Sequence, residues 1–156
     1  MEEQHDMDLL LWRHAEAFDG SPDIARRLTP KGYKQAAAIA AWLSERLPKE
    51  ARIIVSPAAR AQETARALGR TFETVASIAP GADPESLLAA AEWPDATGAV
   101  LIVGHQPTLG EVAAQLLAGQ SLDFSVKKGG LWWLARRMRN DQEQVLLRAV
   151  ANPDLV

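Results

Sequence analysis

Two histidines follow short apolar runs that lie far apart in the sequence. Residues 9–12 lead directly into Arg13 and His14, and residues 99–103 lead through one glycine into His105. A short apolar run that ends in polar residues predicts a strand buried on both faces. In open α/β sheets, ligands bind just beyond the carboxyl ends of such strands. We therefore expect Arg13, His14 and His105 to lie together at one edge of a sheet.

A third corner of the same kind adds a second arginine. Residues 52–55 predict a strand, Ser56 and Pro57 predict the start of a helix, and Arg60 falls in its first turn. Two guanidinium groups beside two imidazoles fit a compact dianion, because arginine pairs with two phosphate oxygens at once. A neutral imidazole can attack phosphorus while the arginines offset the charge on the oxygens. The residue types therefore indicate phosphoryl-transfer chemistry.

The elements that must position these residues alternate between strand and helix. Strands are predicted at 8–13, 52–55, 99–103 and, as a short piece, 74–78; helices are predicted at 30–47, 57–68, 85–92 and 109–118. Three further strands are predicted at 122–126, 131–136 and 144–150, the last two as a hairpin. This order predicts an α/β three-layer sandwich: a mostly parallel central sheet flanked by helices, with a C-terminal antiparallel hairpin.

Length and composition narrow the class of protein. The chain of 156 residues fits one domain, which we expect to span residues 8–156 after a loose tail at 1–7. A net charge of −3 does not favour nucleic-acid binding, and no apolar run approaches the roughly 20 residues that cross a bilayer. The chain has no cysteine and begins with acidic, polar residues. We expect a cytoplasmic monomer with no nucleic-acid or membrane partner.

Four segments, in order, resemble the signature segments of the histidine phosphatase superfamily, formerly the phosphoglycerate-mutase-like group. Residues 13–15 are similar to its Arg-His-Gly signature, and residues 28–36 to Leu-Thr-x-x-Gly-x-x-Gln-Ala. Residues 56–65 resemble Ser-Pro-x-x-Arg-Ala-x-x-Thr-Ala, and residues 103–107 contain a counterpart of Gly-His-x-Pro. The short chain is most similar to the SixA branch, phosphohistidine phosphatases that act on phosphorylated proteins.

The resemblance implies a role for each matching residue. His14 would be the nucleophile that accepts the phosphoryl group, and Arg13, Arg60 and His105 would hold that group. Arg26 would face the substrate, because SixA-like chains also place an arginine just before the Leu-Thr segment. The resemblance implies no cofactor and no metal, and a phosphorylated protein or a small phosphorylated molecule as the substrate.

A strong general acid is missing from the matching segments. Glu16 and Asp83 are the only candidates for this acid, and we expect Glu16 beside the substrate. Neither residue lies in a segment similar to the acid-bearing segments of larger superfamily members that cleave alkyl phosphates. An imidazole leaving group has a conjugate-acid pKa near ~6.5 and departs more easily than an alkoxide. The sequence therefore favours a phosphorus–nitrogen bond as the bond that is cleaved.

Other functions remain open at this point. His14, His105 and Glu16 could hold a metal in a metal-dependent phosphohydrolase, although the adjacent arginines would repel a cation. A non-catalytic phosphate-binding module could keep the same fold. A sugar-phosphate mutase is disfavoured because the chain lacks room for a large lid. Lys127 and Lys128 form either a basic edge or a site that recruits an acidic or phosphorylated partner.

Overall fold

The computed structural model describes residues 6–156, which form strands and helices in an alternating order followed by a hairpin. The elements, in chain order, are β1 (Met7–Arg13), η1 (Asp23–Ala25), α1 (Pro30–Ser44), β2 (Arg52–Val55), α2 (Ala59–Arg66), β3 (Glu73–Thr74), η2 (Ala76–Ile78), α3 (Pro84–Ala90), β4 (Gly98–Gly104), α4 (Thr108–Ala118), β5 (Leu131–Arg139) and β6 (Gln142–Ala151). The η elements are single 3-10 turns.

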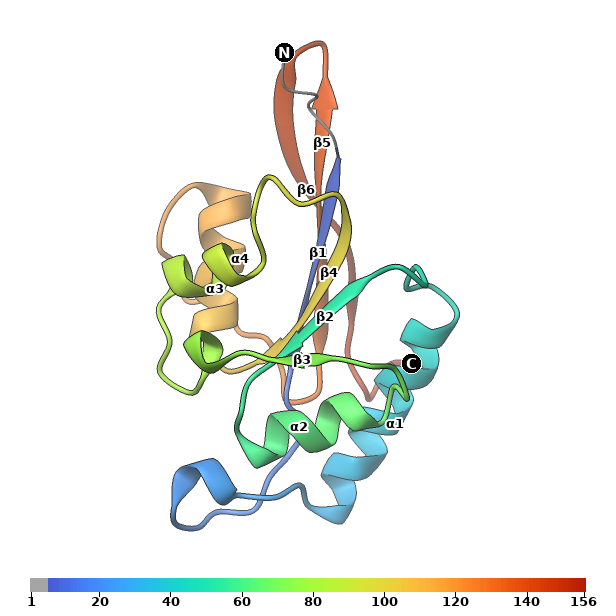
Figure 1. The fold of residues 1–156 in the computed structure, drawn as a ribbon, viewed down its shortest axis with the longest axis vertical. Helices are drawn as coiled ribbons and strands as arrows, with labels where there is room; N and C mark the ends of the chain where they lie inside the picture. Colours follow the sequence, from blue (N-terminus) through green and yellow to red (C-terminus); the bar gives the residue numbers. More distant parts are fainter. Residues whose placement is uncertain (1–5) are drawn as a thin grey trace.

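The strands form one sheet in the order β3-β2-β4-β1-β5-β6. β1 pairs in parallel with β4, and β2 continues this parallel part on the far side of β4. β5 pairs with the other edge of β1 in the antiparallel direction, and β6 completes the hairpin. The carboxyl ends of β1 and β4 point to the same end of the molecule, and the hairpin projects at the opposite end (Figure 1). The predicted sheet and hairpin are confirmed.

Helices cover both faces of the sheet, as the three-layer prediction requires. Side chains alternate between the faces of a strand. Leu10 and Trp12 of β1 therefore pack in a cluster with residues of α1 and α2, whereas Leu9 and Leu11 pack with residues of α3 and α4. These four side chains are fully buried, and the two helix pairs lie on opposite sides of the sheet (Figure 1). β1 is thus covered by helices on both faces and contributes to both hydrophobic clusters.

The prediction of a strand at residues 122–126 is wrong. This segment runs without regular structure, and two of its carbonyls bond to side chains instead of to a neighbouring strand. The carbonyl of Phe124 accepts a hydrogen bond from Gln106 Nε2 at 3.0 Å, and that of Val126 accepts one from Arg13 Nη1 at 3.0 Å. A sequence pattern of alternating apolar residues does not reveal such side-chain partners.

Smaller differences concern the ends of elements. The predicted strand at 74–78 divides into β3 and the turn η2, and α2 begins at Ala59 instead of Pro57. β1 begins at Met7, which is fully buried and does not belong to a loose tail. The rest of the predicted tail, residues 1–5, lies outside the described residues. Among residues 6–156, no helix is long and apolar enough to cross a membrane.

Candidate active site

Three strand ends meet at the lower end of the sheet. Arg13 lies opposite Gly104 in the pairing of β1 with β4, and the amide of His14 donates to the Gly104 carbonyl at 3.1 Å. The amide of Ser56, just after β2, donates to the Val103 carbonyl at 3.1 Å. The parallel pairing therefore brings the residues after β1, β2 and β4 together, as the sequence predicted.

The two predicted histidines lie in contact. The ring centroids of His14 and His105 are 5.2 Å apart, and the residues are 8% and 5% exposed. Nδ1 of His14 lies 2.8 Å from the carbonyl oxygen of Ala15. Because a carbonyl oxygen can only accept, the proton of neutral His14 sits on Nδ1, which leaves the lone pair of Nε2 free. This is the tautomer that a nucleophilic attack by Nε2 requires.

The turn after β1 holds this arrangement in place. Ala15 stands where the superfamily usually has a glycine, and it does not adopt a positive φ, so an alanine is not strained there. Its amide donates to Thr64 Oγ1 at 3.0 Å, which ties the turn to α2. Thr64 Oγ1 in turn donates to the Arg60 carbonyl at 2.7 Å. The turn that follows His14 and the start of α2, which carries Arg60, are therefore joined through one buried hydroxyl.

Both histidines are held in the neutral form. The pKa of His14 is lowered to about 4, mainly by burial. The positive charges of Arg60, Arg13 and Arg26 also lower this pKa, whereas the hydrogen bond to Ala15 raises it. Burial lowers the pKa of His105 to about 3, with further lowering by His14 and Arg60. A neutral imidazole keeps the lone pair needed to attack phosphorus.

Ser56 binds the second histidine. Its Oγ lies 2.7 Å from Nε2 of His105 and accepts a hydrogen bond from the amide of Ala58 at 3.2 Å. The hydroxyl proton of Ser56 is therefore available to Nε2, and a His105 that accepts it carries its own proton on Nδ1. The sequence predicted Ser56 as a helix cap; the structure has α2 begin after Ala58 without a side-chain cap and places the hydroxyl on His105.

The two predicted arginines are anchored differently. Arg13 reaches the Val126 carbonyl, and burial lowers its pKa. Arg60 is 4% exposed, and its Nη1 and Nη2 donate to the backbone oxygen and Oδ2 of Asp23 at 2.8 and 3.0 Å. Asp23 was not predicted as a site residue. The available signal was an acidic residue close to Arg26 in the polar loop that follows His14.

Three buried nitrogens of the predicted site residues have no hydrogen-bond partner in the described part of the chain. They are Nε of Arg13, Nε of Arg60 and Nδ1 of His105, and each comes from a different corner of the sheet. Buried polar groups in folded proteins are usually paired. A phosphoryl group offers several oxygen acceptors and a negative charge that guanidinium groups bind well. The donors of the site therefore fit a phosphoryl group.

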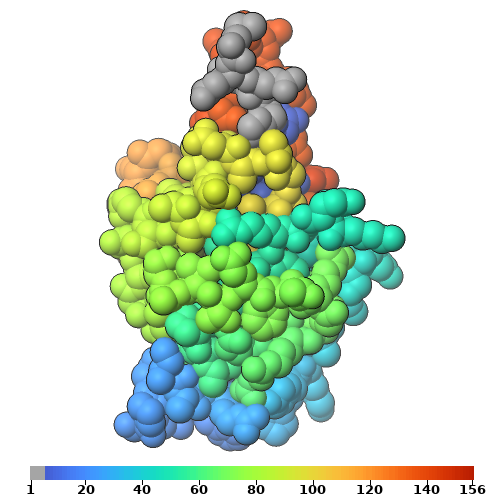
Figure 2. Space-filling view, in the orientation of Figure 1, coloured from blue at the N-terminus to red at the C-terminus, as the bar shows by residue number. Residues whose placement is uncertain are grey.

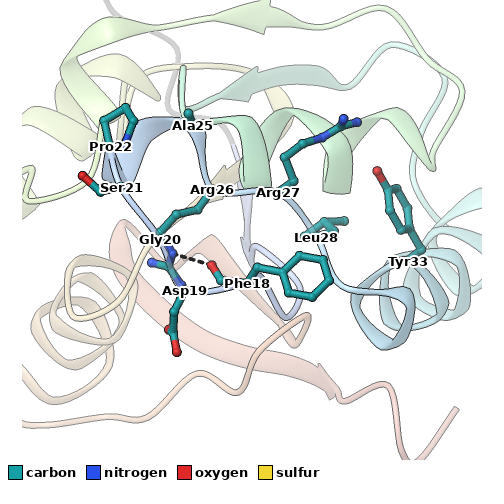
Figure 3. A pocket seen from close by; sticks show the side chains of 10 residues that line it. All are labelled: Phe18, Asp19, Gly20, Ser21, Pro22, Ala25, Arg26, Arg27, Leu28 and Tyr33. Carbon is teal, nitrogen blue, oxygen red and sulfur yellow. Dashed lines mark hydrogen bonds and ion pairs between the residues drawn. The ribbon is translucent and has the colours of Figure 1, made fainter.

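Arg26 lies beside this group of residues, on the loop that leads from β1 to α1. Its Nε donates to the Phe18 carbonyl at 2.7 Å and its Nη1 to Asp23 Oδ1 at 3.1 Å. The loop surrounds a hollow of about 530 Å³ that Arg26, Phe18 and Tyr33 line (Figure 3). In the space-filling view, this blue loop forms the lower end of the molecule (Figure 2). Arg26 thus lines this hollow and is linked to Arg60 through the carboxylate of Asp23.

A buried carboxylate that the sequence analysis missed holds the loop against α2. Glu63 is 6% exposed and accepts hydrogen bonds from the Leu28 amide at 2.9 Å, from Arg27 at 2.8 and 3.0 Å and from the Tyr33 hydroxyl at 2.6 Å. Burial alone would raise the pKa of Glu63, but these hydrogen bonds outweigh it and lower the pKa. A glutamate on the predicted helix gave no signal, because its partners are set by tertiary contacts.

The two acid candidates have partners of their own. Glu16 Oε1 accepts from Thr29 Oγ1 at 2.9 Å, and its Oε2 lies 3.9 Å from Lys31 Nζ. Asp83 caps α3, and its hydrogen bonds with Ser86 lower its pKa, which opposes proton donation. A role of Glu16 toward the substrate stays a prediction.

The metal-dependent alternative finds no support in the arrangement of side chains. Within residues 6–156, no three His, Cys, Asp or Glu side chains lie close enough to share a metal ion. The positive charges of Arg60 and Arg13 act on both histidines, and these arginines would repel a cation. The site is suited to an anion.

Comparison with known proteins identifies the family. The model of the histidine phosphatase superfamily (branch 1) matches residues 9–83. A phosphohistidine phosphatase SixA homolog of Haemophilus influenzae is 35% identical, covering 70% of this chain and 77% of that protein. The phosphohistidine phosphatase SixA of Escherichia coli is 27% identical, covering 74% and 77%. A structure of the protein histidine phosphatase SixA complexed with tungstate shares the fold, with a TM-score of 0.73, 23% identity and coverage of 95% and 98%. The chain belongs to the histidine phosphatase superfamily and is a phosphatase of SixA type.

Proposed function

We propose that this phosphatase removes phosphoryl groups from phosphohistidine on proteins, with His14 as the nucleophile. Nε2 of His14 attacks phosphorus, the bond between phosphorus and the substrate imidazole breaks, and the phosphoryl group is carried on His14. Water then attacks this phosphohistidine, which releases inorganic phosphate and restores neutral His14. The observation that carries the proposal is the free Nε2 of His14, set by the bond from Nδ1 to the Ala15 carbonyl.

The three unpartnered donors support the role of the surrounding residues. Arg13 and Arg60 would bind the phosphoryl oxygens and offset the charge that develops on them during transfer. His105 would donate from Nδ1 without having to gain a proton first, because the Ser56 hydroxyl can serve Nε2. Arg26 would bind the substrate beside them from the loop surface.

The low pKa values of His14, His105 and Asp83 favour a substrate in which a phosphorus–nitrogen bond is cleaved, because such a bond does not need a protonated acid from the enzyme. His14 and His105 are neutral, and Asp83 is held ionised, so none of these three residues offers a protonated acid for an alkoxide leaving group. A phosphorylated imidazole can take a proton on its other ring nitrogen from solvent before the reaction, because the conjugate-acid pKa of imidazole is near ~6.5, and it then leaves as neutral imidazole without a proton from the enzyme. We therefore propose that phosphoramidates react faster than alkyl phosphates.

Trapping of the phosphoenzyme tests the proposal. Labelled phosphohistidine substrate should transfer its label to the wild-type chain, and the label should be lost in acid, kept in alkali and absent from His14→Ala. Similar rates on a phosphoserine peptide and a phosphohistidine protein would refute the preference for phosphorus–nitrogen bonds. Loss of activity with a chelator would favour the metal-dependent alternative. Phosphate binding without turnover of any phosphorylated substrate would favour a non-catalytic module.

We also propose a cytoplasmic monomer with one domain, which begins at Met7 instead of the predicted residue 8 because β1 begins there. The single sheet that runs from β3 to β6 supports one domain, and the absence of cysteine agrees with a reducing compartment. Sedimentation velocity measures the oligomeric state, and limited proteolysis tests the domain limits. A dimer at low concentration, or a stable fragment cut within the sheet, would contradict this proposal.

A further inference from the structure

Next to the phosphoryl site lies a basic groove, which we define by its cationic residues Arg13, Lys31, Lys127 and Lys128. It encloses about 510 Å³ and is completed by polar residues of the loop before β5 and of the segment after β6. Arg13 belongs both to this groove and to the group of unpartnered donors around His14. The groove therefore continues directly from the place where we propose the phosphoryl group binds.

The two lysines stand on a turn that hydrogen bonds attach to Trp12 and His14. Val126 before them and Gly129 after them are buried, whereas both lysines are exposed. The Gly129 amide donates to the His14 carbonyl, and the Gly129 carbonyl accepts from Trp12 Nε1 at 3.1 Å. Gly129 has a φ of +70°, which a residue with a side chain rarely adopts. The turn thus fixes Lys127 and Lys128 beside the backbone of the proposed nucleophile.

The protein itself neutralises the charge of the groove only in part. Neither Lys127 nor Lys128 forms an ion pair with any described residue, and Lys31 only approaches Glu16, at 3.9 Å. Asp154 is the one carboxylate that lines the groove within the described residues. This cationic surface belongs to a chain whose net charge is −3. Positive surface charges that lack internal partners favour a partner of opposite charge.

We propose that the basic groove docks an acidic segment of the phosphorylated partner protein, close to its phosphohistidine. This inference rests on the proposed function, because it extends the same site outward from Arg13. A small phosphoramidate reaches the phosphoryl site but has no segment to fill the groove. The lysines should therefore act on protein substrates and not on the chemical step.

Two matched double variants test the groove. Lys127→Gln with Lys128→Gln removes two positive charges from it, and Lys49→Gln with Arg139→Gln removes two exposed positive charges elsewhere. For a histidine-phosphorylated protein with acidic residues around the phosphohistidine, we expect the first pair to lower kcat/KM roughly tenfold, mainly through KM. For free phosphohistidine we expect no change, and the second pair should leave both substrates unaffected. Added salt should reduce the wild-type rate on the protein and narrow its difference from the first pair.

The outcomes separate this inference from the proposed function. An unchanged kcat/KM for the acidic protein in the lysine variant would overturn the docking role. An equal loss on both substrates would also overturn it, since the lysines would then serve the site itself or its fold. Binding of the unphosphorylated acidic protein to His14→Ala, with and without the lysine substitutions, tests docking apart from catalysis. If the wild type releases phosphate from neither substrate, the proposed function fails, whereas weaker binding by the lysine variant still supports the groove.

Discussion

Oγ of Ser56 lies 2.7 Å from Nε2 of His105, and this contact joins the corner after β2 to the corner after β4. The same Oγ accepts a hydrogen bond from the amide of Ala58 and still has its proton to donate to the imidazole. A Ser56 hydroxyl that donates to Nε2 confines the proton of neutral His105 to Nδ1. We therefore propose that Ser56 is a positioning residue that acts on the substrate through His105.

We predict that Ser56→Ala lowers kcat/KM about tenfold, the effect of losing one hydrogen bond of roughly 1.4 kcal/mol. The imidazole nitrogen chemical shifts of His105 should change at the same time, because the proton is no longer confined to Nδ1. Ser44→Ala is the matched control, since Ser44 bonds only to the Ala40 carbonyl on α1. A Ser56→Ala enzyme with wild-type activity and wild-type His105 shifts would contradict this role.

The buried histidines predict a specific dependence of stability on pH. Their folded pKa values, about 4 for His14 and about 3 for His105, lie below the value near ~6.5 of an unfolded histidine. Between these limits the unfolded chain binds more protons, so the free energy of unfolding rises with pH, by about 1.4 kcal/mol per pH unit for each histidine. Urea unfolding from pH 4 to 7 measures this slope.

His14→Ala provides the control for this slope, because it removes one of the two contributing protons and should reduce the slope accordingly. Nitrogen NMR should show His14 neutral throughout the range from pH 5 to 8, with Nε2 unprotonated, as a nucleophile must be. Protonation of His14 near pH 6.5 would show that burial does not lower its pKa and would remove the electrostatic support for attack at neutral pH.

Asp23 binds Arg60 and Arg26, two arginines that we propose bind the phosphorylated substrate. Its carboxylate binds Arg60 and Arg26, and their hydrogen bonds lower its pKa, so it stays ionised at neutral pH. We expect Asp23→Asn to bind inorganic phosphate or vanadate about two- to fivefold more tightly, the scale of an exposed ion pair. Inhibition constants measure the effect, and Asp19→Asn, an exposed acid 3.9 Å from Arg26, is the control. Weaker binding by Asp23→Asn would mean that Asp23 chiefly orients Arg60.

We expect substitution of Glu63 to lower the stability of the protein rather than its catalytic activity. Glu63 is buried and binds Arg27, Tyr33 and the Leu28 amide, which together hold the loop that carries Asp23 and Arg26. Glu63→Gln weakens these charge-assisted bonds, and we expect the free energy of unfolding to fall by about 1–3 kcal/mol. Urea unfolding measures this change, with the exposed Glu50→Gln as the control. Equal stability of the two variants would show that the loop is held by other contacts.

The sequence was sufficient to predict the central strands and the three corners. The apolar runs before His14 and His105 are too short for helices and end abruptly in polar residues, so local pattern and the geometry of parallel sheets already placed Arg13, His14, Arg60 and His105 together. The alternation of strands and helices was enough for the layered fold. These features depend on periodicity and on short-range turn signals, which a single sequence records.

Contacts between distant segments were decided only by the tertiary structure. Side chains that bond to distant elements explain what the sequence did not predict. They account for the irregular structure of residues 122–126, the contact of Ser56 with His105, and the partners of Glu63 and Asp23. Hydrogen bonds of this kind leave no periodic trace in the sequence, because their specificity lies in packing and direction. The residue types thus determined which chemistry is available, and the packing decided which nitrogen is free to perform it.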